Sequence, residues 1–247
     1  MRLGSLIRWS ARAGVAALVA VAVLRAADAQ FVMTPRPGDR IAEMRHHYEQ
    51  VTSVYEAVVR GDLPAVRTPA TELSAIATPV DAGPEVVKVL DAVREAARRV
   101  MVAGTLQEAA APTAAMLAQC GACHRASAVY PTPSPLRTPD VGGIVGHMLD
   151  HQLAMDSLLQ GLVIPSDARW AEGAKRLAAA PMARADLPPD HGLTPQVRQA
   201  EIDVHAFADR AATASDSGTR TEVFADLMLT CARCHGLHEQ IWGPRTR

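Results

Sequence analysis

The sequence predicts an all-α protein built from two tandem four-helix bundles, and three observations lead to this fold class. Alanine is abundant, while aromatic residues make up only 4% of the chain, a composition that favours helices over sheets. Apolar residues recur at helical spacing, and alternating β-branched runs are absent. The same order of helix signals also occurs twice, which is typical of an internal repeat.

The first unit contains four expected helices. Asp39 and Gly61 are expected to cap the two ends of the first helix. Thr105 and Glu108 form the Thr-x-x-Glu pattern of a capping box ahead of the last one. The four helices are expected at 39–61, 68–77, 84–104 and 105–126.

The second unit follows the same plan, with a further Thr-x-x-Glu pattern at Thr219 and Glu222. Its helices are expected at 140–161, 167–180, 195–214 and 219–235. A Pro-rich stretch between the units predicts a stiff, extended connector, because closely spaced prolines cannot lie inside a helix. The predicted domains are therefore a first bundle at 30–128, a linker at 129–140 and a second bundle at 141–247.

The N-terminus predicts export from the cytoplasm. Residues 1–29 combine basic residues, a short apolar run and an Ala-x-Ala site, which together are typical of a secretory signal peptide cleaved between Ala29 and Gln30. The apolar run is shorter than the ~20 residues that a membrane-spanning helix needs. We therefore expect a periplasmic protein without a transmembrane segment in its mature chain. Without residues 1–29, which hold four Arg and one Asp, the 25 basic and 26 acidic residues fall to 21 and 25. This mild acidic excess argues against nucleic acid or an anionic membrane as a partner.

Two short motifs contain all four cysteines of the chain. The first motif is Cys-Gly-Ala-Cys-His at 120–124, and the second motif is Cys-Ala-Arg-Cys-His at 231–235. Cys-x-x-Cys-His is the attachment sequence of c-type haem, in which the two thiols bind the porphyrin edge and the histidine binds iron. The motifs therefore predict two covalent haem c groups. The covalent anchors are Cys120, Cys123, Cys231 and Cys234, and the proximal iron ligands are His124 and His235.

Other uses of these cysteines fit the sequence less well. A thioredoxin-like site needs a βαβ context, and the sequence shows no strand pattern. A structural zinc site would need ligands from two motifs that lie far apart in separate units. A disulfide pair is a further alternative, but two motif matches that use every cysteine of an exported chain favour haem.

The position of the motifs separates two kinds of cytochrome. Only 12 residues follow His235, too few to build the small cytochrome c fold, whose motif comes near the start of its domain. A motif on the last of four helices resembles the cytochrome c-prime family, the class II four-helix cytochromes. The resemblance covers the mature chain as two tandem copies and rests on helix order and the terminal motifs. It implies a four-helix bundle around each haem.

Histidines on the first helix of each unit are candidates for the distal iron ligand, because the start of helix one and the end of helix four lie at the same end of such a bundle. A shift of 100 residues places His47 on His147. We expect His47 to face the haem on Cys120 and Cys123, and His147 to face the other. His151, one helical turn further, is the competitor.

Two further expectations concern the histidines. The resembling family has a methionine or an apolar residue on the distal wall, so a histidine there is a departure. The other histidines have no counterpart in the repeat and are expected at the surface: His191, His205 and His238.

Two imidazoles on each iron would leave no open position, which suits electron transfer. The first expectation is therefore a periplasmic dihaem electron carrier rather than an enzyme. Its partner would be a periplasmic or membrane-bound redox protein, and the resemblance also allows a homodimer. The alternative is a gas-binding or sensing protein with five-coordinate haem, and a dihaem peroxidase is the third hypothesis.

Overall fold

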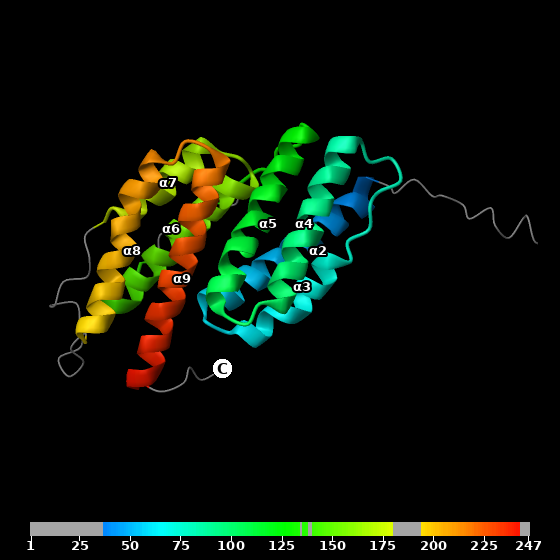
Figure 1. The fold of residues 1–247 in the computed structure, drawn as a ribbon. Coiled ribbons are helices and arrows are strands. Elements are labelled where there is room, and N and C mark those ends of the chain that lie inside the picture. The colour runs from blue at the N-terminus through cyan, green and yellow to red at the C-terminus, as the bar shows by residue number, and fades with distance from the viewer. Residues whose placement is uncertain (1–36, 134, 138–139, 180–193, 243–247) are drawn as a thin grey trace, which may run out of the picture. The chain divides into compact units, whose positions relative to one another are not determined.

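The computed structural model describes residues 37–133, 135–137, 140–179 and 194–242, and these ranges are helical without any strand. This confirms the all-α fold class. The described residues from 45 onward form one compact unit. The elements in Figure 1 are α2 (Pro37–Val59), the short 3-10 helix η1 (Leu63–Val66), α3 (Arg67–Ser74), α4 (Pro84–Val102), α5 (Leu106–Ala126), α6 (Gly143–Val163), α7 (Asp167–Leu177), α8 (Pro195–Thr213) and α9 (Ser217–Trp242).

Helix caps explain where the two motif helices begin. The predicted capping box of α5 is confirmed: the Glu108 amide donates to Thr105 Oγ1, and the Thr105 amide donates to the Glu108 carboxylate, each at 3.2 Å. The predicted box of α9 is wrong. That helix begins at Ser217, and Asp216 accepts a hydrogen bond from the Thr219 amide at 3.0 Å. An aspartate in this place is a strong N-cap, so the helix starts ahead of Thr219.

We call α2–α5 the first half of the described chain and α6–α9 the second half. A shift of 111 residues along the sequence maps the last two helices of the first half onto the last two helices of the second. It superposes the N-caps Thr105 and Asp216, and it superposes Cys120 on Cys231. The preceding helices, α4 and α8, both begin with proline and are both 19 residues long, with the same displacement. The repeat predicted from the order of signals is thus supported by matching helix boundaries.

The two halves of the described chain share one hydrophobic core. The motif helices α5 and α9 pack against each other (Figure 1), and α6 contacts both of them. Buried side chains of both halves belong to one cluster, including Val54 and Leu117 from the first half and Leu158 and Phe224 from the second. The ring of Tyr55 on α2 stacks on Phe224 of α9 at 5.6 Å. The core joins the two halves, and a division into two bundles at 129–140 stays a prediction.

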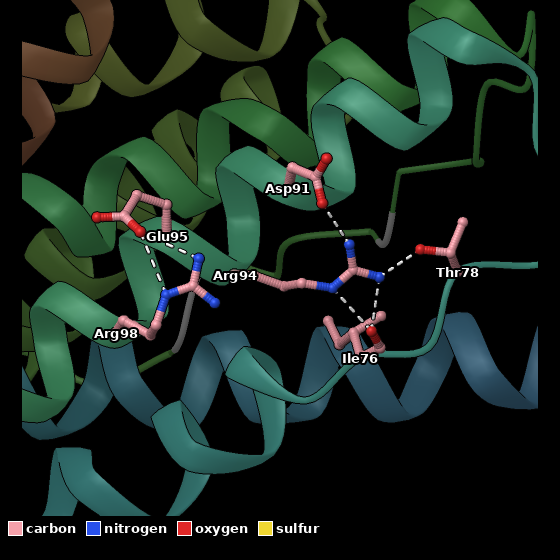
Figure 2. Close-up of polar contacts among 6 residues, drawn as sticks. All are labelled: Ile76, Thr78, Asp91, Arg94, Glu95 and Arg98. Carbon is pink, nitrogen blue, oxygen red and sulfur yellow. Dashed lines mark hydrogen bonds and ion pairs between the residues drawn. The ribbon is translucent and has the colours of Figure 1, made fainter.

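A largely buried arginine ties the segment after α3 to helix α4. Figure 2 shows Arg94 donating from Nε and Nη2 to the carbonyl of Ile76, at 2.9 and 2.7 Å. Arg94 also reaches Thr78 Oγ1 and Asp91 Oδ1, each at 2.6 Å. Arg98, one turn along, makes only an exposed pair with Glu95. The planar guanidinium thus fixes the segment between α3 and α4.

Among the described helices, none has the length and hydropathy that crossing a bilayer requires. The predicted signal peptide at 1–29 lies outside the described residues, as do His191 and the side chain of His238.

Candidate functional site

The cysteines of each motif lie one turn apart on a helix, α5 for the first motif and α9 for the second. Residues three apart on a helix face the same side, so both thiols of a motif can reach one edge of a planar group. None of the four cysteines forms a disulfide. Burial raises the pKa of Cys120 and of Cys231 to about 12. These thiols stay protonated, which argues against a redox-active thiolate pair.

Each motif histidine is held by a backbone carbonyl from the other half of the chain. His124 Nδ1 lies 2.6 Å from the carbonyl oxygen of Val163, at the end of α6. His235 Nδ1 lies 2.8 Å from the carbonyl oxygen of Val59, at the end of α2. A carbonyl only accepts, so Nδ1 carries the proton in both rings and Nε2 carries the lone pair. This is the tautomer and the orienting bond that metal-binding histidines use.

Gly121, inside the first motif, allows α6 to approach α5 this closely. A Cβ atom at Gly121 would overlap the backbone carbonyl of Leu162. At the second motif the residue equivalent to Gly121 is Ala232. Here the glycine belongs to the facing segment: it is Gly61, directly after α2, and a Cβ there would lie 3.8 Å from the carbonyl oxygen of Ala232. Gly61 is required for a different reason: its φ is +76°, in the left-handed region that ends α2.

A cavity of about 650 Å³ opens beside the second motif. Cys231, Cys234 and His235 line one side of it, and α2, α6 and α8 supply the rest of the wall. Its size lies within the range of roughly 300–1,000 Å³ seen for cofactor sites. Two thiols on one helix face, a histidine with its lone pair on Nε2 and a cavity beside them are what covalent haem requires. The residues of the second motif therefore fit the group that the sequence predicts.

The first motif faces the early part of α2. Burial raises the pKa of Tyr48, and the nearby Asp156 and Cys120 raise it further, which places this turn of α2 near the first motif. His47, the neighbour of Tyr48, is partly buried. His46 is exposed and lies 3.4 Å from the carboxylate of Glu72. This evidence concerns Tyr48, so the partnership of His47 with Cys120 and its role as an iron ligand stay predictions.

The two candidate histidines of α6 have different surroundings. His151 lines the cavity at the second motif, and its Nε2 lies 3.2 Å from His205 Nε2 on α8. His147 Nε2 lies 3.1 Å from Glu201 Oε1, also on α8. Burial lowers the pKa of His151 to about 3, and the neighbouring His147 and His205 lower it further. Burial also lowers the pKa of His147, although the nearby Glu201 and Asp150 act to raise it. Both rings are therefore neutral at pH 7.

The prediction that His205 is a surface group is wrong. Its ring is partly buried, 5.0 Å from the ring of His151, and its Nδ1 lies 2.7 Å from the carbonyl oxygen of Leu177. The sequence did contain a signal for this contact. His147 and His151 lie four residues apart on one helix, and Glu201 and His205 lie four residues apart on another, so each pair faces one way.

The bonds of the motif histidines also suggest an alignment of the first helices. The carbonyls of Val59 and Val163 each bind a motif histidine, so these two residues occupy equivalent positions in the repeat. They are 104 residues apart in the sequence, whereas the alignment of His47 with His147 uses a shift of 100. With the shift of 104 residues, His47 corresponds to His151, one turn beyond His147. A change of four residues keeps the same helix face, which is why apolar spacing allowed both alignments.

Comparisons with protein-family models, with curated proteins and with solved structures found no match for this chain. The likeness to class II cytochromes therefore rests on the motifs and the helix order alone.

Proposed function

We propose that this protein is an exported c-type cytochrome that carries two covalent haems and transfers electrons. The observation that supports this most directly is the pair of motif histidines, each with its Nδ1 directed at a carbonyl and each following two thiols on the same helix face. All four cysteines of the chain are used in this way. A periplasmic location and a redox protein as the partner belong to the same proposal.

The chain's own residues would perform the binding and the orientation. Cys120 and Cys123 would hold one haem through thioether bonds, and Cys231 and Cys234 the other, while His124 and His235 would each offer Nε2 to iron. Haem, when bound, supplies a one-electron redox couple. The contact between α5 and α9 puts the two attachment helices side by side, which supports passage of electrons between the two sites.

The experiment that tests the proposal is production of the exported chain in cells that attach haem c. Intact mass and a haem stain after denaturation should show two covalent haems. The double variants Cys120→Ala/Cys123→Ala and Cys231→Ala/Cys234→Ala should each retain one. Absence of covalent haem, in cells that load a reference c-type cytochrome, would overturn the proposal.

His47 is the proposed distal ligand of the first haem. The variant His47→Ala should produce a high-spin signal from one iron, because the haem held by Cys120 and Cys123 would lose the second imidazole that this proposal assigns to it. His46→Ala is the matched control, since His46 is exposed and bound to Glu72 on the surface. An unchanged low-spin spectrum in His47→Ala would show that another group occupies this position. For the second haem the candidates on α6 are His147 and His151.

The second candidate function is binding of a small gas at the second haem, and the cavity of about 650 Å³ beside His235 is the observation that favours it. Carbon monoxide added to the reduced protein should then change the spectrum of one haem out of two. A spectrum unchanged by carbon monoxide at both haems would leave electron transfer as the function.

A further inference from the structure

Two pairs of side chains from α6 and α8 meet beside the second motif, and we call them the histidine cluster: His147, His151, His205 and Glu201. The ligand nitrogens of the three histidines all lie within 4.8 Å of one another. Two contacts are already close, 3.2 Å between His151 Nε2 and His205 Nε2 and 3.1 Å between His147 Nε2 and Glu201 Oε1. Ligands at about 2.0–2.1 Å around a tetrahedral zinc ion are about 3.3 Å apart, so the two close contacts match such a site. The histidine nitrogens that lie farther apart, within 4.8 Å, would draw closer on metal binding.

The surroundings of the cluster hold these side chains in place. Only 3% of the Glu201 side chain and 15% of the His147 side chain are exposed. The bond from His205 Nδ1 to the carbonyl of Leu177 fixes the proton on Nδ1, which leaves the lone pair of Nε2 directed at the cluster. His147 Nε2 is buried and makes no hydrogen bond of full geometry among the described residues, although Glu201 Oε1 lies 3.1 Å away. A buried polar atom in this state is costly, and a bound cation would satisfy it.

We propose that His147, His151, His205 and Glu201 bind a divalent transition-metal ion other than the haem iron, with Zn²⁺ as the best-fitting ion. Three imidazoles and one carboxylate are ligands that suit zinc and its neighbours rather than Mg²⁺ or Ca²⁺, which prefer oxygen. Helix spacing supports the site, because each helix contributes two ligands four residues apart.

The metal site has one consequence that rests on the proposed haem function. A histidine that binds the proposed zinc ion through Nε2 cannot also bind haem iron through that nitrogen. The second haem would then receive no imidazole from α6 and would keep an open position beside the cavity, whereas His47 would close the first. The axial role predicted for His147, with His151 as its competitor, is the opposite outcome, and the two can be separated experimentally.

The test is elemental analysis of the purified full chain, loaded with haem and treated with a chelator that leaves haem iron in place. Addition of Zn²⁺ should give one equivalent of bound zinc per chain. The variants His205→Gln and Glu201→Gln should bind zinc at least ~10-fold more weakly. His46→Ala, which removes an exposed histidine outside the cluster, should bind zinc as the wild type does. Helical content by circular dichroism should be equal in all variants.

Three outcomes would overturn the metal site: no stoichiometric zinc, zinc binding that survives His205→Gln, or a high-spin second haem in His147→Ala or His151→Ala without any loss of zinc. The last outcome would assign that histidine to haem iron. Failure of the haem proposal looks different, because the protein would then lack covalent haem while the zinc measurement remains possible.

Discussion

The two Cys-x-x-Cys-His motifs lie at equivalent positions of a repeat, yet their surroundings differ. The first motif packs closely against the end of α6, because Gly121 has no side chain and the backbone carbonyl of Leu162 lies where a Cβ atom would be. The second borders a cavity of about 650 Å³ and, next to it, the histidine cluster. At the displacement that relates α4 to α8, His205 corresponds to Arg94 and Glu201 to Leu90. The repeat thus preserves the attachment helices, while the neighbouring positions make the two sites different.

Arg94 and His205 also show what the halves have kept in common. Each side chain donates to a carbonyl at or just after the end of the short helix of its own half, Ile76 after α3 and Leu177 in α7. In the first half this is a structural tie. In the second half the corresponding bond, from His205 to Leu177, orients the imidazole of His205 toward the other residues of the histidine cluster. The equivalent contact therefore serves the proposed metal site in one half and only the packing in the other.

The largest effect is expected when the halves are separated. Because one core and two crossed histidine bonds join them, the fragments 30–128 and 141–247 should each fail to fold alone. Circular dichroism and the sharpness of thermal unfolding would measure this. Co-expression should restore a cooperative transition. Two fragments that unfold cooperatively by themselves would instead show two independent bundles.

Gly121→Ala should cost about 3 kcal/mol of unfolding free energy, at the upper end of typical overpacking costs, because the new Cβ meets the backbone at Leu162 rather than a flexible side chain. Gly236→Ala is the matched control, since it directly follows the second motif and a Cβ there meets nothing within 4 Å. That variant should be neutral or gain up to about 1 kcal/mol. Equal urea midpoints for the two variants would show that α6 does not press on the first motif.

Arg94→Ala should cost about 2 kcal/mol, because two charge-assisted hydrogen bonds to the partly buried carbonyl of Ile76 are lost. Arg98→Ala, which removes only the exposed pair with Glu95, should change the unfolding free energy by less than about 0.5 kcal/mol. Urea unfolding of both variants measures the difference. If Arg98→Ala proved as costly as Arg94→Ala, the tie drawn in Figure 2 would have no special role.

The smallest effect concerns the helix caps. Glu108→Ala should cost about 0.5–1 kcal/mol, because Glu108 accepts from the amides of Gly104 and Thr105. Glu222→Ala should cost only a few tenths, since α9 begins ahead of it and Asp216 is the cap. Thermal unfolding with matched wild-type controls is sensitive enough for both. A larger loss in Glu222→Ala would restore the capping box that the sequence predicted there.

Local signals in the sequence predicted much of this protein. Helix type, approximate boundaries, the capping box of α5 and the placement of each motif on a final helix all depend on residues a few positions apart. Such signals act within one or two helical turns, so the local sequence is sufficient to predict these features. The cap of α9 was missed because two candidates, Asp216 and Thr219, lie three residues apart and the stronger one starts the helix earlier.

Only the tertiary structure decided which residues of different helices meet. Helical spacing repeats the same face every four residues, so the sequence could not choose between the alignment of His47 with His147 and that with His151. The hydrogen bonds of His124 to Val163 and of His235 to Val59 each join one half of the chain to the other, and no local sequence pattern predicts them. The sequence therefore determined the helices and the predicted cofactor chemistry, while packing decided the neighbours of each histidine, because those neighbours come from distant helices.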